Sequence, residues 1–180
     1  MRNGYESLIG GFKPPEGGAE LLDPKMRNSH EFPKWLNLPE TQDKLRGKNV
    51  MMYCTGGIRC ERASALLSQM EAVTHSFSTG GITMVRGGVD RYIKTYPGGG
   101  HWSGKNYLFD MREEQVPDGK SDCQASKEAE EGAGGARCCL CSQPWSKYKD
   151  KHMCVQEECK TPVLVCDACR ASKAPVVSLS

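Results

Sequence analysis

The stretch Val50-Met51-Met52-Tyr53-Cys54-Thr55-Gly56-Gly57-Ile58-Arg59-Cys60-Glu61-Arg62 decides the fold of this chain. An apolar run of strand formers ends at Cys54, a loop with two glycines follows, and a helix-forming run extends from Cys60 to Met70. Loop N–H groups and the positive end of a helix dipole both favour negative charge at that point. Arg59 adds a full positive charge, so we expect the pKa of the Cys54 thiol to be lowered toward neutrality. These features predict that Cys54 is a nucleophile; the alternative is a buried structural cysteine.

The length of the loop narrows the chemistry that it suits. Only Thr55, Gly56, Gly57 and Ile58 separate Cys54 from Arg59. Gly56 and Gly57 allow consecutive N–H groups to turn inward without a side-chain clash. The corresponding loop of phosphatases is one residue longer, which gives room for a tetrahedral phosphate. The shorter loop favours a terminal sulfur carried on the cysteine as a persulfide.

The segments around this loop predict an α/β fold with a parallel sheet flanked by helices. We expect a short helix within 31–38, strands at 49–53 and 82–85, and helices at 60–70 and 89–96. Strand, helix, strand and helix in succession are typical of parallel pairing. Such sheets bind ligands at the carboxyl ends of their strands, where Cys54 lies.

Basic and aromatic residues alternate downstream of the second predicted strand. Arg86, Arg91, Trp102 and Lys105 are the candidates for contacts with substrate. Their mixture suits phosphate binding combined with base stacking on a single-stranded nucleic acid. The alternative, slightly favoured by composition alone, is that the aromatic residues form core and the charges a solvated face.

Residues 113–136 are polar, acidic and poor in large apolar side chains. Such a composition predicts a disordered linker. Cys123 lies within it, and we expect no function for this cysteine.

Most of the ten cysteines lie in the C-terminal part of the chain, several of them in C-x-x-C pairs. Two such pairs complete a tetrahedral structural zinc site, and a segment this short depends on a metal for its folding energy. We therefore predict that 137–170 binds zinc through Cys138, Cys141, Cys166 and Cys169. Cys154 and Cys159, with Cys139 or His152, are possible ligands of a second site or replacements in the first. The spacing does not choose between these ligand sets.

The chain's general composition places it in a reducing compartment. Its 180 residues carry a formal net charge of +2, so the chain as a whole lacks a strong polyanion-binding signature. Clustered C-x-x-C pairs favour metal binding over a secreted disulfide framework. Neither a signal peptide nor a membrane-spanning apolar run is evident, so we expect a cytoplasmic location and no membrane partner.

Several motifs together resemble one family. The active-site stretch is similar to the loop of rhodanese domains, and more narrowly to rhodanese-like proteins of the tRNA uridine hydroxylase family and their eukaryotic thiosulfate sulfurtransferase/rhodanese-like relatives. The supporting matches are Arg2-Asn3-Gly4-Tyr5-Glu6, Glu31-Phe32-Pro33, Arg86-Gly87-Gly88-Val89, Arg91-Tyr92, Tyr96-Pro97, Trp102-Ser103-Gly104-Lys105-Asn106 and the cysteine-rich tail.

The resemblance implies both an activity and a domain plan. It implies a Cys54 nucleophile held by Arg59 and the loop N–H groups, tRNA as partner, oxidation of the wobble uridine with oxygen, and no organic cofactor. The alternatives are a sulfurtransferase that uses a small sulfur donor, and a catalytically impaired adaptor with a zinc-binding tail.

We expect a rhodanese-like domain at 1–112, the linker at 113–136 and the zinc segment at 137–170. Family members carry a ferredoxin-like domain and a first strand before the Arg-Asn pair, so we expect the first domain to be N-terminally incomplete. Cys60 is expected to be a helical core residue, with the resolution of an oxidised Cys54 as its alternative role.

Overall fold

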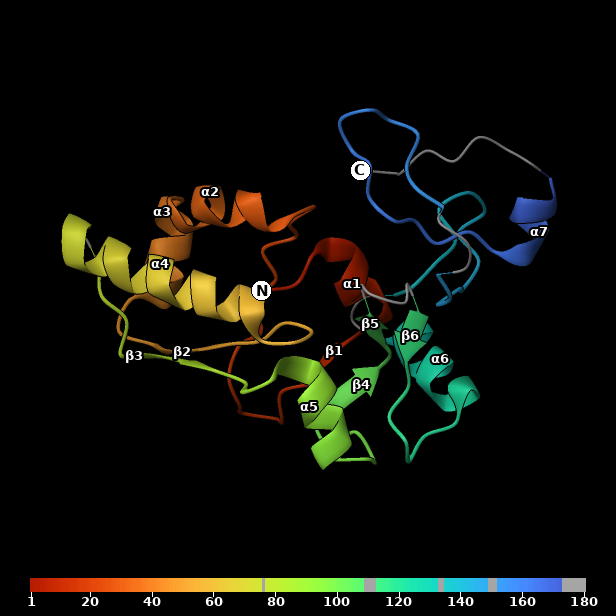
Figure 1. Ribbon diagram of the computed structural model, residues 1–180, viewed down its shortest axis with the longest axis horizontal. Coiled ribbons are helices and arrows are strands. Elements are labelled where there is room, and N and C mark those ends of the chain that lie inside the picture. The colour runs from red at the N-terminus through yellow and green to blue at the C-terminus, as the bar shows by residue number, and fades with distance from the viewer. Residues whose placement is uncertain (76, 109–112, 133–134, 149–151, 173–180) are drawn as a thin grey trace. The chain divides into compact units, whose positions relative to one another are not determined.

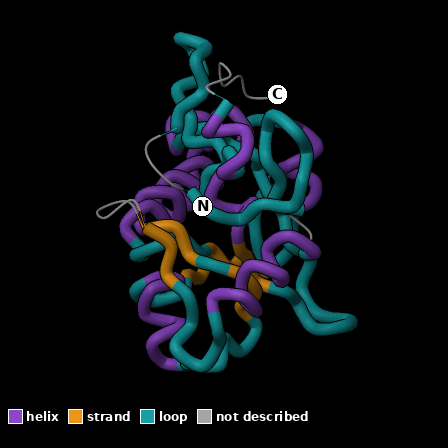
Figure 2. The backbone as a smooth tube through the Cα atoms, turned by 90° about the vertical axis from the view of Figure 1, so that its right-hand side faces the viewer, coloured by secondary structure: helices purple, strands orange, loops and turns teal. Residues whose placement is uncertain are grey.

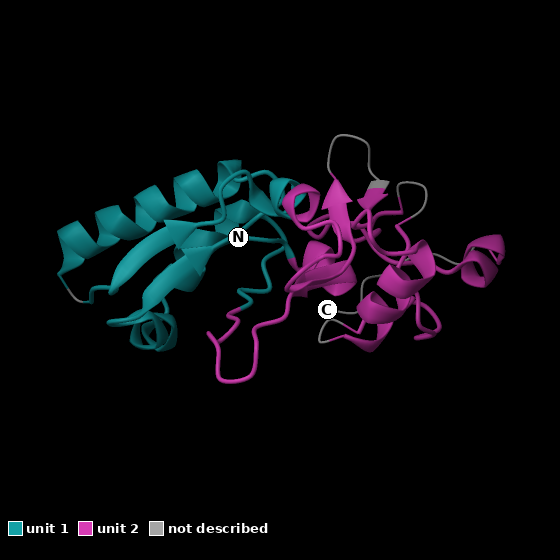
Figure 3. Ribbon diagram, turned by 90° about the horizontal axis from the view of Figure 1, so that it is seen from below, with its two compact units in different colours: residues 1–3, 23–92 teal, residues 4–22, 93–180 magenta. Residues whose placement is uncertain are grey.

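The computed structural model describes residues 1–75, 77–108, 113–132, 135–148 and 152–172. Helices and short strands are joined by a large share of loop (Figures 1 and 2). The chain divides into two compact units (Figure 3): unit 1 comprises residues 1–3 and 23–92, and unit 2 comprises 4–22 and 93–180. The expected boundary between 112 and 113 therefore falls inside unit 2.

Unit 1 is built around a parallel strand pair. Strand β2 (Asn49–Met52) pairs with β3 (Gly81–Met84), and Met52 lies opposite Met84. Helix α4 (Ile58–Thr74) connects the two strands and contacts β3, as in a β-α-β unit. The remaining helical segments of this unit are η1 (Ser29–Glu31), α2 (Phe32–Leu36) and α3 (Pro39–Leu45).

Helix α4 buries a narrow apolar face. Cys60, Ala63 and Leu67 are spaced by three and four residues, and all three are buried. The helix begins two residues earlier than expected, directly after Gly57, whose φ of 97° few other residues adopt. It ends at His75, which takes the left-handed conformation and donates its N–H to the Glu71 carbonyl oxygen.

Unit 2 contains antiparallel pairs. Strand β1 (Gly10–Phe12) pairs with β4 (Trp102–Gly104), and β5 (Asn106–Leu108) pairs with β6 (Glu113–Gln115). Helix α5 (Gly88–Thr95) spans the boundary between the two units. The described residues therefore form a mixed α/β fold with three two-stranded sheets, and a larger parallel sheet is not confirmed. Helices α1 (Gly4–Ile9) and α3 were not expected.

An aromatic core joins the two ends of unit 2. Tyr107 packs edge-to-face against both Tyr5 and Tyr148, with ring centroids 5.4 Å apart in each pair. Tyr148 also donates its hydroxyl to the Tyr5 carbonyl oxygen at 2.6 Å. Ile9 and Leu164 belong to the same cluster. The cysteine-rich tail thus shares a core with residues near the start of the chain.

The predicted disordered linker has regular structure instead. Within 113–136 lie β6 and helix α6 (Asp122–Glu131), whose first turn is closed by a capping box between Ser121 and Gln124. Ala125 and Ala129 are buried. Disorder was expected because the segment has low hydrophobicity. Helix α6 packs through two alanines and is held by ion pairs, so it does not depend on large apolar side chains. Among the described residues, no helix has the length and apolar character needed to cross a membrane.

Candidate active site and metal centre

Cys54 lies between the end of β2 and the start of α4, and only 1% of its surface is exposed. Its Sγ accepts the backbone N–H of Gly57 at 3.1 Å. The thiol of Cys60 also donates to this sulfur, while the Cys60 backbone N–H donates to the Gly57 carbonyl oxygen at 2.9 Å. Two donors, one from the loop and one from the first turn of α4, therefore converge on one sulfur atom.

These contacts favour the ionised sulfur. The hydrogen bond from the Cys60 thiol is the largest effect, and with the N–H groups and the charge of Arg59 it outweighs burial and lowers the pKa of Cys54 to about 5. The same hydrogen bond raises the pKa of Cys60 far above its usual range. At neutral pH the pair is therefore one thiolate and one thiol.

Arg59 lies beside the loop in a half-buried position. Its guanidinium donates to the Thr55 hydroxyl at 3.1 Å. The guanidinium charge contributes to the lowered pKa of Cys54. Ile58 is 73% exposed and Gly56 is exposed as well, so the tip of the loop faces solvent above the buried sulfur.

A second loop holds the cysteine loop from the side. The N–H groups of Val89 and Asp90 donate to the carbonyl oxygens of Cys54 and Thr55 at 2.9 and 3.0 Å. This approach requires Gly88, because a Cβ there would lie 2.4 Å from the Thr55 oxygen and 2.5 Å from the Cys54 oxygen. The Arg86-Gly87-Gly88-Val89 motif thus fixes the loop that carries Cys54.

The predicted substrate-binding residues fall into two groups. Arg86 and Arg91 are exposed on the second loop and on α5, and the Arg91 side chain lies against Gly87. Trp102 and Lys105 are in unit 2, where 1% and 0% of their surfaces are exposed. Trp102 packs edge-to-face on Phe12, and Lys105 forms ion pairs, so both side chains have structural roles.

The sequence reasoning missed two contributions to the site. Cys60 was expected to be core, and it is buried, but its thiol also donates to Cys54. The second contribution is the support that the loop around Gly88 gives to the cysteine loop. The available signal was the close spacing of Cys54 and Cys60 in the sequence.

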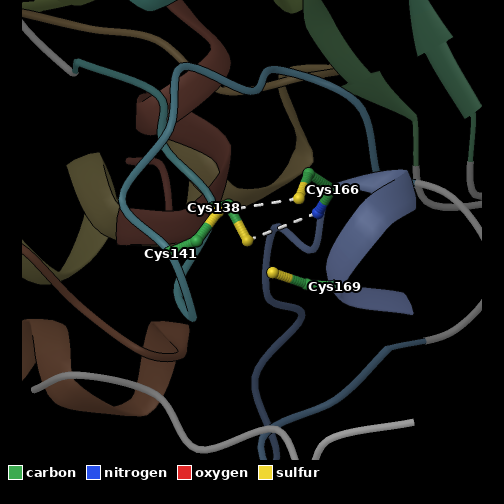
Figure 4. A group of neighbouring side chains, drawn as sticks. All are labelled: Cys138, Cys141, Cys166 and Cys169. Carbon is green, nitrogen blue, oxygen red and sulfur yellow. Dashed lines mark hydrogen bonds between the residues drawn. The ribbon is translucent and has the colours of Figure 1, made fainter. Parts of the chain in front are cut away.

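In unit 2 four predicted metal ligands come together (Figure 4). The sulfurs of Cys138, Cys141, Cys166 and Cys169 all lie within 4.8 Å of one another, and those of Cys141 and Cys166 are 3.6 Å apart. A tetrahedral zinc with Zn–S bonds of about 2.3 Å places its sulfurs about 3.8 Å apart. The cluster therefore has the dimensions of a four-thiolate metal site.

The four thiols of the cluster differ in how readily they ionise. Although burial opposes it, backbone N–H groups, first that of Cys166, lower the pKa of Cys138 to about 6. Hydrogen bonds from the Cys169 thiol to the sulfurs of Cys141 and Cys166 raise the pKa of Cys169 to about 12. Four sulfurs this close ionise together only when a cation offsets their mutual repulsion.

The possible second ligand set, Cys154 and Cys159 with Cys139 or His152, remains a prediction. Among the described residues, Cys154 and Cys159 belong to no group of metal-binding size. Cys154 is buried next to Val163 and Val165, and the Cys159 sulfur lies 3.1 Å from the Thr161 hydroxyl. Both cysteines thus lie in or against the apolar cluster of the tail.

The chain is similar to rhodanese-like proteins and to tRNA uridine hydroxylases. Residues 103–179 match the family described as "Rhodanase C-terminal". The chain is 37% identical over 94% of its length to "Rhodanese-like domain-containing protein 6" of Arabidopsis thaliana and spans 25% of that protein. It is 32% identical over 95% of its length to the "tRNA uridine(34) hydroxylase" of Arthrobacter sp. (strain FB24) and spans 48% of it. No solved structure matches at a significant level. The chain thus spans a quarter to a half of the length of these curated relatives.

Proposed function

The chain is a homologue of rhodanese-like domain proteins, and from this premise we propose that it acts in tRNA modification through a nucleophilic Cys54. The proposed reaction is hydroxylation of the wobble uridine, the reaction named for the bacterial relatives. The proposed substrate is therefore a tRNA anticodon, and the proposed compartment is the cytoplasm.

The geometry around the Cys54 sulfur carries this proposal. Donors from Gly57 and Cys60 converge on a sulfur whose pKa is lowered to about 5, so the sulfur is anionic at neutral pH without a separate base. A structural cysteine buried in an apolar core has a raised pKa instead. The loop therefore supplies a preformed nucleophile.

The surroundings of the loop suit a polyanionic substrate. Arg59 lies within the first turn of α4, and Arg86 and Arg91 flank the glycines that contact the cysteine loop. We propose that Arg86 and Arg91 bind backbone phosphates on either side of the reacting base. The buried Trp102 and Lys105 have no part in this proposal.

A sulfurtransferase activity is the second candidate, and the short loop favours it. In that reaction the Cys54 thiolate attacks the outer sulfur of thiosulfate, the S–S bond breaks and sulfite leaves with the bonding electron pair. The product is a persulfide on Cys54, which the Gly57 and Cys60 donors and Arg59 are placed to hold. Hydrogen-bond donors directed at the Cys54 sulfur suit both the hydroxylase and the sulfurtransferase reaction. The two proposed reactions differ in the substrate that Cys54 acts on.

The cysteine cluster has a structural part in this proposal. We propose that Cys138, Cys141, Cys166 and Cys169 hold one zinc ion, which fixes the tail against the Tyr5, Tyr107 and Tyr148 core. The cluster lies in unit 2 and Cys54 in unit 1, and the role that we propose for the metal is structural.

Nucleoside analysis of tRNA tests the main proposal. Cells that lack the gene should lose 5-hydroxyuridine-type modification at the wobble position, and the full-length protein should restore it. Cys54→Ser should fail to restore it, whereas Cys123→Ser, which changes an exposed cysteine on α6, should restore it fully. An unchanged nucleoside profile in the deletion strain would refute the hydroxylase proposal. Labile sulfur on purified wild-type protein after thiosulfate treatment, absent in Cys54→Ser, would then favour sulfur transfer.

A further inference from the structure

Unit 1 contains two cysteines, Cys54 and Cys60, and they lie in contact. Both are buried, with 1% and 0% of their surfaces exposed. The Cys60 side chain sits on the first turn of α4 and donates its thiol hydrogen to the Cys54 sulfur. The packing of a helix does not require this arrangement, since Ala63 fills the next position on the same face without a polar atom.

We propose that Cys54 and Cys60 form a redox pair, in which Cys60 closes a disulfide with Cys54 once a hydroperoxide has oxidised the Cys54 thiolate. The inference rests on the proposed role of Cys54 as a reactive thiolate. It goes further by assigning a modification site and by giving Cys60 a chemical role besides positioning.

The reaction proceeds in two balanced steps. The Cys54 thiolate attacks one oxygen of the hydroperoxide, the O–O bond breaks, and the products are a Cys54 sulfenic acid and, after protonation, water or an alcohol. The Cys60 sulfur then attacks the Cys54 sulfur, the S–O bond breaks, and the leaving hydroxide departs as water with the Cys60 proton. Two thiols are oxidised by two electrons, and the peroxide is reduced by the same two.

Oxidation of Cys54 makes it easier for the Cys60 thiol to lose its proton, as the second step requires. While Cys54 is a thiolate, its hydrogen bond and charge keep the Cys60 thiol protonated. Oxidation of Cys54 removes that negative charge and therefore removes the influence that holds the Cys60 proton. Cys60 thus becomes a better nucleophile when its partner becomes an electrophile.

The loop between the two cysteines is open at Gly56. A disulfide has an S–S length of about 2.05 Å, so the two side chains must move together from hydrogen-bond distance. Gly56 lies in the loop between them, and a Cβ built there would meet no atom within 4 Å. Gly56 is therefore not packed against another part of the chain on that side.

Such a disulfide would protect the site. A sulfenic acid with no nearby thiol is oxidised further to sulfinic and sulfonic acids, which cellular thiols do not reverse, whereas a disulfide is reduced by them. The pair therefore makes oxidation of Cys54 reversible.

Peptide mapping after peroxide treatment tests the proposal. The reduced, metal-loaded protein is treated with limiting hydrogen peroxide, free thiols are blocked with iodoacetamide, and the peptides are analysed by mass spectrometry. We expect a linkage between Cys54 and Cys60 that dithiothreitol removes. In Cys60→Ala and Cys60→Ser we expect no such linkage, capture of a Cys54 sulfenic acid by dimedone, and progressive irreversible oxidation.

Two results would overturn the redox pair. One is a Cys54 sulfenic acid that accumulates in the wild-type protein while Cys60 remains open to alkylation. The other is a Cys54 disulfide to a different cysteine. The wild-type measurement stands alone if the variants do not fold. It also requires no tRNA or sulfur acceptor, so failure of the proposed reaction and failure of the redox pair are seen separately.

Discussion

The backbone N–H of Val89 donates to the carbonyl oxygen of Cys54 over 2.9 Å. This bond joins the first turn of α5 to the loop that carries the candidate nucleophile, and the adjacent bond from Asp90 to Thr55 repeats it. Both carbonyl oxygens are thereby turned toward α5, while the N–H of Gly57 is turned toward the Cys54 sulfur. The thiolate site is thus held by two loops, one after each strand of the parallel pair.

Replacement of Gly88 by alanine should disrupt this support. The added Cβ would clash with the Thr55 and Cys54 oxygens, and the φ of 65° is unfavourable for alanine, so we expect a loss of about 1–3 kcal/mol of unfolding free energy. The displaced loop should also slow the alkylation of Cys54. Gly56→Ala is the matched control, because its Cβ would meet open space in the same loop. Equal losses in both variants would show that the contact with α5 is unimportant.

The reactivity of Cys54 should persist to low pH. Its pKa of about 5 lies below the ordinary value of 9.0, so the alkylation rate should stay nearly constant from about pH 9 to pH 6 and halve near pH 5. Cys60→Ala should move this midpoint upward, and Cys60→Ser, which keeps a donor, should move it less. Alkylation by iodoacetamide, followed at the Cys54 peptide, measures the midpoint. A wild-type midpoint near 9 would contradict the thiolate.

The same shift makes a contribution to stability that depends on pH. The folded pKa is lower than the unfolded one, so the thiolate stabilises the fold fully above about pH 9. This contribution declines as the pH falls and is absent below about pH 5.

The sequence predicted the parts of the fold that depend on local patterns. The two strands lie within one residue of their expected places, because apolar runs and glycines mark them. The helix between them begins two residues earlier and ends four residues later than expected. The clustering of Cys138, Cys141, Cys166 and Cys169 was also expected, since C-x-x-C spacing is itself a geometric constraint.

The sequence could not show features that depend on distant contacts. Lys105 was a candidate for substrate binding, but its side chain is fully buried and forms ion pairs with Glu114 and Asp122. These partners lie nine and seventeen positions further along the sequence. Helix α6 was expected to be disordered because its composition gives no sign that Lys120 would pair with Glu128. Ion pairs of this kind follow from tertiary structure, and no local periodicity reveals them.

Removal of the metal should unfold the tail. The four-cysteine segment has few large buried side chains of its own, so we expect about one zinc per chain and a lower melting temperature after chelation. Cys166→Ser should abolish stoichiometric zinc binding. Cys154→Ser should retain about one zinc, because Cys154 lies outside the cluster. Metal analysis of the purified variants distinguishes these cases, and about two zinc ions per wild-type chain would point to a second site.

Lys105 should be essential to unit 2 because it balances buried charge. Its ammonium lies 3.1 Å from a carboxylate oxygen of Glu114 and 3.0 Å from one of Asp122. Burial raises the pKa of Glu114, and Lys105 opposes that rise. Lys105→Met fills similar space but leaves Glu114 without its cation, and breaking a buried pair in this way costs about 3–5 kcal/mol.

Lys147→Met removes the more exposed partner of Asp122 and should cost less than about 1 kcal/mol. Denaturant unfolding measures both, and the double variant Lys105→Met/Glu114→Gln should recover part of the loss. If Lys105→Met cost no more than Lys147→Met, the ion pairs of Lys105 would be dispensable, and a role for this lysine outside the core would have to be reconsidered.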